Sequence, residues 1–300
     1  MSLTELPVPD DLFPGFRMLD VATAQVRLRV RMGGEGPPLL LLHGYPQTHI
    51  MWRRVAPALA RRFTVICPDL RGYGDSEKPP STADHVPYAK RVMAQDMAEL
   101  MTALGHERFF VGSHDRGARV AHRLALDHGQ RVLKLATLDI APTREMYRDA
   151  GDRFARAYWH WFFLIQPAPM PERMIGADPD FYWTSRRASD LALFEPAALD
   201  HYLRCFRDPA VIHASCEDYR AAATIDIAHD DADGGKTVSC PLLALWGERG
   251  AVGRCFDVLA LWRERADDVR GHALPGGHYL AEELPDLVVQ DFIAFFGDAS

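Results

Sequence analysis

The clearest chemical signal in the sequence lies around Asp115, where the apolar run Phe109–Val111 leads through Gly112-Ser113-His114 to Asp115-Arg116-Gly117 and a helix-like stretch. Small residues at Ser113 and Gly117 allow a strand to turn abruptly into a helix with one side chain at the tip. This is the nucleophile-elbow pattern, with Asp in place of the usual Ser. A carboxylate that displaces a leaving group from an sp3 carbon forms an ester that water can hydrolyse, whereas a Ser would form a stable ether. Asp115 therefore predicts alkyl transfer, and the alternative is a helix cap.

A histidine and one of two acids could complete a hydrolytic site. His278 lies in Pro275-Gly276-Gly277-His278-Tyr279, between the last predicted strand and the last predicted helix, where a loop can reach back to the elbow. We expect His278 to deprotonate the water that hydrolyses the ester, while a carboxylate holds its other ring nitrogen. Asp139 and Glu248 each follow an apolar strand. We favour Asp139, because it ends its strand directly, whereas Glu248 is flanked by Arg249 and fits a surface ion pair.

Two arginines follow the elbow at helical spacing. Arg116 and Arg119 are three residues apart, so their side chains share one face of the predicted helix. The guanidinium fork binds carboxylates bidentately, and the positive end of the helix adds to the field. Beside a nucleophilic Asp115 they predict a small 2-haloacid, held with its α-carbon facing the nucleophile. The alternative is that one or both pair with core acids such as Asp139 or Glu217.

The elements that must position these residues alternate between strand and helix, which is typical of a mainly parallel sheet covered on both faces. The sequence predicts strands over 26–31, 39–42, 63–67, 108–111, 132–138, 241–247 and 268–274, and helices over 52–60, 90–104, 119–126 and 284–296. Asp139 lies at the carboxyl edge of this sheet, where ligands gather in such folds. The Gly-rich segment 69–76 lacks the Lys-Ser/Thr ending of a P-loop and predicts a structural turn.

The alternation stops from about Pro142 to about Thr224, where aromatic, arginine and proline residues dominate and the pattern is helical. We predict a core in two parts, residues 1–142 and 225–300, with a helical cap over residues 143–224. The cap is expected to lie over the carboxyl edge of the sheet. Residues 230–236, with three aspartates and two glycines, are expected to form an exposed loop.

Composition narrows the class of protein. A chain of 300 residues with 48% hydrophobic content can bury a large core. A formal net charge of -7 and the lack of a basic run argue against a nucleic-acid binder. The five cysteines are scattered and lack C-x-x-C spacing, so neither a disulfide framework nor a zinc site is indicated. Without a signal-peptide pattern or an apolar run of membrane-spanning length, we expect a cytoplasmic protein with no membrane partner.

These motifs resemble those of the α/β-hydrolase superfamily and, within it, the haloacetate and fluoroacetate dehalogenases, over nearly the whole chain. The resemblance rests on six segments: His43–His49, His114–Arg119, Leu138–Ile140, Tyr158–Trp161, Cys216–Arg220 and Gly277-His278. It implies a nucleophile at Asp115, a base at His278 and an acid at Asp139, in agreement with the choice made from the residues. The chain departs from the family at Ser113, where Gly is usual, and at Tyr45, where Phe is usual.

The resemblance also implies the rest of the site. It places His160, Trp161 and Tyr219 around the departing halide, where two N–H donors and one O–H donor stabilise the developing charge. The backbone N–H groups of Tyr45 and Arg116 are the expected oxyanion hole. The implied reaction converts a haloacetate, such as fluoroacetate, to glycolate and halide without a metal or organic cofactor. Homodimers are common in the family.

Two other functions stay open. An epoxide hydrolase also uses an Asp nucleophile but needs cap tyrosines to protonate the opening oxygen, and the candidates are Tyr158, Tyr182, Tyr202 and Tyr219. The pair Arg116 and Arg119 argues against it, because a neutral epoxide needs no carboxylate clamp. A non-catalytic ligand-binding member of the fold is opposed by the complete set of nucleophile, base and acid.

Overall fold

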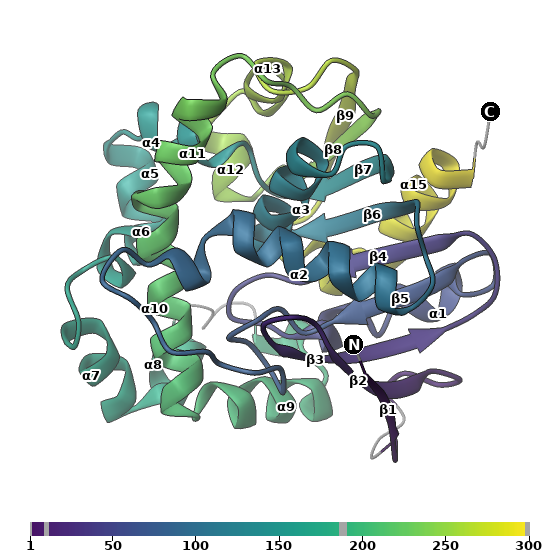
Figure 1. The fold of residues 1–300 in the computed structure, drawn as a ribbon. Coiled ribbons are helices and arrows are strands. Elements are labelled where there is room, and N and C mark those ends of the chain that lie inside the picture. The colour runs from purple at the N-terminus through teal and green to yellow at the C-terminus, as the bar shows by residue number, and fades with distance from the viewer. Residues whose placement is uncertain (1, 9–11, 186–190, 298–300) are drawn as a thin grey trace.

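The computed structural model describes residues 2–8, 12–185 and 191–297. The predicted core and cap both extend over residues outside these ranges, namely 1, 9–11, 186–190 and 298–300. One sheet runs through the described chain in the order β1-β2-β3-β5-β4-β6-β7-β8-β9 (Figure 1). The strands are β1 Leu3–Leu6, β2 Arg17–Ala22, β3 Arg27–Gly33, β4 Pro38–Leu42, β5 Thr64–Pro68, β6 Phe109–His114, β7 Val132–Leu138, β8 Leu242–Gly247 and β9 Val269–Leu274.

The sheet is parallel from β5 to β9 and antiparallel from β1 to β3, and β3 pairs antiparallel with β5. The predicted fold class is therefore confirmed. The strands β1 and β2 were not predicted. Residues of β1 are mostly exposed and give no apolar alternation to recognise.

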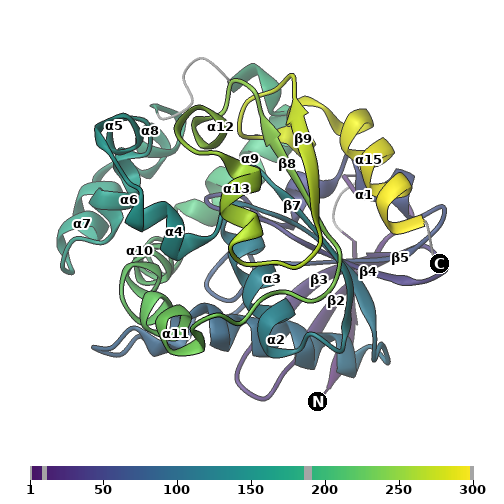
Figure 2. The same ribbon diagram turned by 90° about the horizontal axis from the view of Figure 1, so that it is seen from above.

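Helices cover both faces of the sheet. Figure 2 shows α2 (Lys90–Ala103) and α3 (Asp115–Asp127) on one side and α1 (Ala56–Leu59) and α15 (Pro285–Gly297) on the other. The apolar residues of α2 recur at helical spacing and are buried, and the helix ends before Gly105, whose φ of +83° suits glycine. The remaining short elements of the core are η1 His49–Trp52, η2 Val86–Tyr88, α12 Ala251–Cys255, α13 Val258–Arg263 and α14 Leu280–Glu283.

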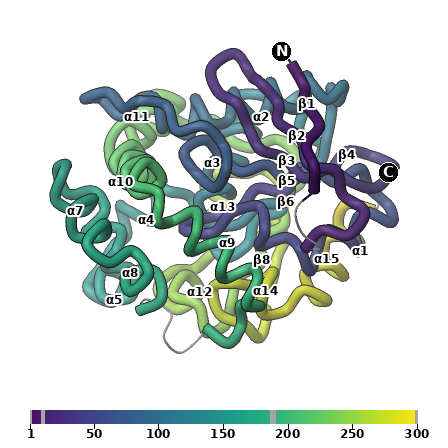
Figure 3. Tube along the Cα trace, turned by 90° about the horizontal axis from the view of Figure 1, so that it is seen from below, coloured from purple at the N-terminus to yellow at the C-terminus, as the bar shows by residue number. Residues whose placement is uncertain are grey.

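A run of helices separates β7 from β8. These are α4 Thr143–Arg148, α5 Asp152–Ala157, α6 Trp159–Leu164, α7 Met170–Ala177, α8 Pro179–Ser185, η3 Leu191–Leu193, α9 Pro196–Phe206, α10 Pro209–Ala223 and α11 Ile225–Asp233. Helices α5, α7 and α8 lie on the side of the molecule away from α15 (Figures 1 and 3). The division into core and cap at residues 142 and 224 stays a prediction.

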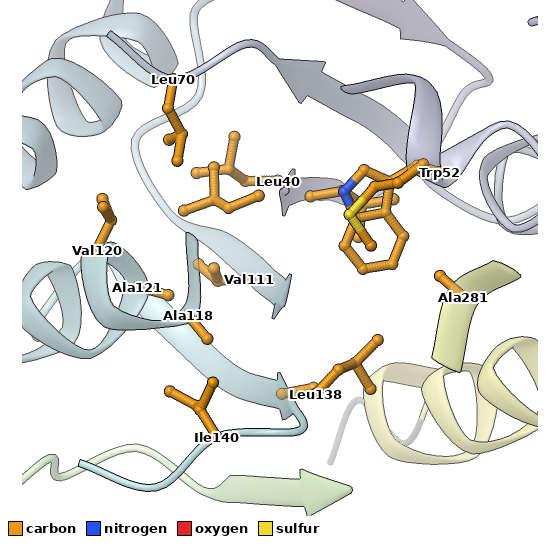
Figure 4. Packing of buried hydrophobic residues seen from close by; sticks show 14 of the residues in the cluster. Leu40, Trp52, Leu70, Val111, Ala118, Val120, Ala121, Leu138, Ile140 and Ala281 are labelled. Carbon is orange, nitrogen blue, oxygen red and sulfur yellow. The ribbon is translucent and has the colours of Figure 1, made fainter. Parts of the chain in front are cut away.

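Close packing between β6 and α3 sets the position of the elbow. Figure 4 shows Val111 of β6 beside Ala118 and Ala121 of α3, and all three side chains are fully buried. Small side chains on this face let the helix approach the sheet closely. At Gly117 a Cβ atom would lie 2.2 Å from the carbonyl oxygen of His43, so any other residue would push α3 away.

The expectation of an exposed loop over residues 230–236 is wrong for its first half. Helix α11 continues to Asp233, and Asp230 is buried. Both aspartates pair with Arg123, which projects from α3. A local run of acids is typical of an exposed segment. Here Asp230 and Asp233 instead pair with Arg123, which lies more than 100 residues earlier in the chain.

The predicted helix over residues 52–60 is also divided. A 3-10 helix, η1, ends at Trp52, and a single α-helical turn, α1, begins at Ala56. Pro57 at the start of α1 has no N–H to bond to an earlier turn. Within residues 2–8, 12–185 and 191–297, no helix is long and apolar enough to cross a membrane.

Candidate active site

Asp115 is the first residue of α3 and has a φ of +46°, in the left-handed region that non-glycine residues rarely adopt. Such strain persists where the surroundings fix it. At Gly44 a Cβ atom would lie 2.4 Å from the Cβ of Asp115, so the elbow is packed directly against the loop after β4. Ser113 donates its hydroxyl to the carbonyl of Ala136 at 2.8 Å and so ties β6 to β7. The serine at this position is therefore accommodated by a hydrogen bond.

The structure brings three of the predicted residues together. Nδ1 of His278 donates to Oδ2 of Asp139 at 2.6 Å, and Nε2 of His278 lies 3.8 Å from Oδ2 of Asp115. Asp139 is fully buried, and its other oxygen accepts from the backbone N–H of Gly247 at 3.0 Å. Glu248 is exposed. Of the two acids, only Asp139 contacts the histidine.

The nucleophile candidate is held in its ionised form. Burial alone would raise the pKa of Asp115, but His278, followed by the charges of Arg116 and Arg119, outweighs burial and brings its pKa below the ordinary value. Burial lowers the pKa of His114 to about 3, so that imidazole is neutral. Its Nε2 donates to the carbonyl of His278 at 2.9 Å, which helps to fix the loop that carries the base.

One predicted oxyanion donor already contacts the carboxylate. The backbone N–H of Tyr45 donates to Oδ1 of Asp115 at 2.9 Å. The two carboxylate oxygens are thus distinguished, with Oδ1 bound by the loop after β4 and Oδ2 facing His278. The phenol of Tyr45, where Phe is usual, lies 3.4 Å from the hydroxyl of Tyr182 in α8.

Arg116 is paired with an acid, as the alternative interpretation allowed, but with Asp218 of α10 instead of Asp139 or Glu217. Its Nε donates to Oδ2 of Asp218 at 3.0 Å, and its Nη2 donates to Oδ1 at 2.9 Å and to the backbone carbonyl at 2.8 Å. Nη1 is buried and has no hydrogen-bond partner among the described residues. The ring of Tyr219 covers the guanidinium, with its centroid 4.1 Å away.

Arg119 differs from Arg116 in having no carboxylate partner in the described part of the chain. It donates to the hydroxyl of Thr143 at 2.8 Å and to the carbonyl of Ala141 at 3.2 Å, and it stacks on Trp161 with its guanidinium carbon 4.6 Å from the ring centroid. Its side chain is buried, and Nε has no partner within the described ranges. Burial, followed by the charge of Arg116, lowers its pKa to about 10. Arg119 is therefore a buried cation whose hydrogen bonds, within the described residues, go to neutral groups.

The three side chains predicted around a halide are also gathered. His160, Trp161 and Tyr219 are buried, and the ring centroid of Tyr219 lies 5.9 Å from that of His160 and 6.3 Å from that of Trp161. Nε1 of Trp161 is buried without a hydrogen-bond partner in the described chain. The ring of Tyr45 lies 5.3 Å from Tyr219, so this group adjoins the elbow loop. Their role stays a prediction.

Comparisons with known proteins agree with this geometry. Residues 37–285 match the sequence profile of the alpha/beta hydrolase fold. The chain belongs to the α/β-hydrolase family. It is 48% identical over 295 residues to a protein named fluoroacetate dehalogenase from Burkholderia sp, with 96% of each chain covered. It is 35% identical over 281 residues to the soluble epoxide hydrolase of Corynebacterium sp. (strain C12), covering 90% of this chain and 93% of the other.

A solved structure from Nostoc sp PCC 7120, described provisionally as an alpha/beta hydrolase, superposes with a TM-score of 0.92 at 57% identity and covers 95% of this chain and 99% of that one. The overall fold of this member of the family therefore follows a known arrangement. The family membership predicted from the motifs is confirmed.

Sequence reasoning missed several neighbours of the site. Asp218 lies inside the segment Cys216–Arg220 that carried the resemblance, and its place before Tyr219 was the available signal. Lys90, which pairs with Asp218, looks like an ordinary solvated residue at a helix start. Tyr158 was considered only for epoxide opening, yet its hydroxyl lies 3.2 Å from Nδ1 of His278.

Proposed function

We propose that this α/β-hydrolase is a hydrolytic dehalogenase that converts a small 2-haloacid, a haloacetate such as fluoroacetate, to glycolate and halide. The single observation that carries the proposal is Arg119, a buried guanidinium without an anionic partner in the described chain, next to a buried and ionised Asp115. An unpaired buried charge is costly, and a substrate carboxylate would compensate it. The fluoroacetate dehalogenase from Burkholderia supports the same substrate class.

In the first step, Oδ2 of Asp115 attacks the α-carbon of the haloacid. The new carbon–oxygen bond forms as the carbon–halogen bond breaks, and the halide leaves with the bonding electron pair. The substrate carboxylate accepts hydrogen bonds from Nη1 of Arg116 and Nε of Arg119, the donors that have no other partner among the described residues. A carboxylate gripped at one end presents its α-carbon in a fixed direction, which lowers the entropic part of the barrier.

The leaving halide needs donors, and fluoride most of all, because it is a poor leaving group. We assign this role to the N–H groups of His160 and Trp161 and the hydroxyl of Tyr219. Donors fixed in a buried site stabilise developing charge better than water does, since they need no reorganisation. The buried Nε1 of Trp161 supports the assignment.

In the second step, Nε2 of His278 removes a proton from water, and the hydroxide attacks the carbonyl carbon of the Asp115 ester. Asp139 orients the imidazole and stabilises the imidazolium that forms. The negative charge of the tetrahedral intermediate develops on Oδ1, where the backbone N–H of Tyr45 already donates, and the N–H of Arg116 is the second donor. Collapse of the intermediate breaks the bond between Cγ and Oδ2, and the imidazolium of His278 gives its proton to the departing oxygen, which leaves as the hydroxyl of glycolate. The new carboxyl group of Asp115 then ionises, and one of its two oxygens comes from water.

We further propose that residues 143–224 act as a cap over a core of residues 1–142 and 225–300, and that the enzyme is a cytoplasmic homodimer. Free thiols support a reducing compartment, since all five cysteines are unpaired and four of them are buried. Analogy with the family supports the dimer.

Epoxide hydrolysis is the second candidate, and one relative at 35% identity carries that name. The cap supplies tyrosines near the site, since Tyr158 contacts His278 and Tyr219 covers Arg116. Tyr202 is engaged elsewhere, donating to Glu282 at 2.7 Å. A neutral epoxide would leave Arg119 without compensation, so the haloacid is the better fit.

The test is to incubate the full-length protein with fluoroacetate, chloroacetate and styrene oxide, and to measure halide and diol. Asp115→Ala serves as the inactive control. We expect halide from at least one haloacetate and none from the control. Diol from styrene oxide without halide from either acid would overturn the dehalogenase in favour of an epoxide hydrolase.

A further inference from the structure

The guanidinium of Arg116 is fixed by two consecutive residues of α10. A guanidinium has five N–H donors. The one on Nε and the two on Nη2 match the three acceptor contacts with Asp218, and the ring of Tyr219 covers one face. The two donors that remain are both on Nη1, which is buried without a partner in the described chain. Asp218 and Tyr219 together thus leave Nη1 as the one nitrogen of Arg116 that can still donate within the described chain.

Asp218 is itself held from the core side. It is fully buried, its Oδ2 accepts from the hydroxyl of Tyr73 at 2.6 Å, and its Oδ1 accepts from Nζ of Lys90. Asp226 of α11 accepts from the backbone N–H of Lys90 at 2.8 Å and lies 3.6 Å from its ammonium. The carboxylate of Asp218 therefore accepts from Arg116, Tyr73 and Lys90 and has little freedom to rotate.

We infer that Asp218 is a positioning residue, which holds Arg116 so that Nη1 meets the substrate carboxylate. This inference rests on the proposed function. Among the described residues, the side chain of Asp218 bonds to Arg116, Lys90 and Tyr73 and not to Asp115, so it acts through the arginine.

Charge balance gives the inference its physical basis. Arg116 and Lys90 are both buried, and the carboxylate of Asp218 lies between them. Burial would raise the pKa of Asp218, but these two cations outweigh burial and bring the pKa well below its usual range. With a neutral side chain at position 218, two cations would face each other in a dry environment, and Arg116 would move. A misplacement of about 1 Å in a positioned group can cost ~100-fold in rate.

The experiment compares Asp218→Asn with a matched control, Asp96→Asn. Asp96 accepts a similar buried fork from Arg71, with two contacts of 2.6 Å, away from the elbow. We measure the melting temperature and the kinetics of halide release from chloroacetate. Both variants should melt lower than wild type. Only Asp218→Asn should raise KM, by ~10- to 100-fold, with a smaller change in kcat, because the grip on the carboxylate acts in the ground state as well as the transition state.

A milder pair keeps the test decisive if Asp218→Asn does not fold. Tyr73→Phe removes one donor to Asp218, and Tyr88→Phe removes a buried hydroxyl that donates to the carbonyl of Pro79 instead. Tyr73→Phe should raise KM for chloroacetate ~2- to 5-fold, by the net worth of one hydrogen bond, and Tyr88→Phe should not. An unchanged KM in Tyr73→Phe, or in a folded Asp218→Asn, would overturn the inference.

Failure of the proposed function gives a different result. Wild type and both controls would then release no halide from either fluoroacetate or chloroacetate. In that case the crystal structures of wild type and Tyr73→Phe decide, since the inference requires the guanidinium of Arg116 to shift or to lose order in the variant. An unmoved guanidinium would overturn it.

Discussion

Replacing Arg119 by methionine should separate the contribution of this residue to binding from its contribution to folding. Arg119 is 3% exposed, and its guanidinium bonds only to neutral acceptors among the described residues. Arg123, one turn along α3, is also 3% exposed but pairs with Asp230 and Asp233. Both arginines lie in α3 and are equally buried, but among the described residues only Arg123 has a carboxylate counter-ion. Arg123→Met is therefore the control.

The expected change in stability follows from the environment of each cation. A pKa lowered to about 10 means that burial, together with the charge of Arg116, disfavours charged Arg119 by ~3 kcal/mol relative to water. This penalty applies at every pH below that pKa, so it is fully present at neutral pH. Its two neutral hydrogen bonds contribute ~1 kcal/mol each, and its stacking on Trp161 ~1 kcal/mol. These effects nearly cancel, so Arg119→Met should change the free energy of unfolding by no more than ~1 kcal/mol.

The control should behave in the opposite way. Arg123→Met strands the buried carboxylate of Asp230, which costs ~3 to 5 kcal/mol, whereas Asp233 keeps Arg91 as a partner. Burial already raises the pKa of Asp230 to about 6 with Arg123 present. Loss of this cation should not change KM for chloroacetate, because Arg123 contacts acids of α11 and Asp127, away from the elbow.

Urea denaturation gives the stability, and halide release from chloroacetate gives KM. Arg119→Met should fold as stably as wild type and raise KM ~100-fold, the loss expected for a charge-assisted contact of ~3 kcal/mol. The reasoning would be refuted if Arg119→Met were as destabilised as Arg123→Met and kept the KM of wild type, because Arg119 would then be a structural residue.

Three further outcomes are expected. Asp139→Asn should lower kcat ~10⁴-fold, as loss of the orienting acid does in related triads, while the exposed Glu248→Gln should leave it unchanged in the same halide assay. His278→Gln should release about one halide per active site and stop, with the ester on Asp115 visible as a mass increase; continued turnover would exclude His278 as the base. Because the pKa of Asp115 lies below its ordinary value, the nucleophile stays ionised as pH falls to ~4. The halide burst of the first turnover of wild type, measured by rapid quench, should therefore persist at that pH, while later turnovers slow. A burst lost between pH 6 and 5 would contradict the lowered pKa.

The parts of the fold that periodicity could predict are those with a buried face. Strands such as Leu39–Leu42 are apolar throughout because both faces of a parallel strand are covered, and these residues are fully buried. The antiparallel strand β1 has one partner and mostly exposed residues, so it left no pattern. Strand β2 places Asp20 within reach of Arg27 and Arg29 of β3, a pairing that becomes visible only when the two strands are aligned.

The reacting groups could be predicted because chemistry restricts both their type and their place. A nucleophile on an elbow, an acid after a strand and a histidine on a late loop are each recognisable locally, and Asp115, Asp139 and His278 do meet. Asp218 and Lys90 could not be found in this way. They are separated by 128 positions, and neither has a local pattern that indicates burial. Their pairing depends on how α10 packs against α2, which spacing along the chain does not encode.

The charges around the elbow explain why two arginines, and not one, accompany the nucleophile. Arg116 is paired with Asp218, whereas Asp115 is the described carboxylate whose charge acts on Arg119. In the proposed reaction, alkylation turns Asp115 into a neutral ester, and its negative charge departs with the halide. The carboxylate of the bound acid then becomes the counter-ion of Arg119, so the intermediate is held until water attacks. Hydrolysis restores the carboxylate of Asp115 beside the glycolate anion, and repulsion between these two like charges favours release of the product.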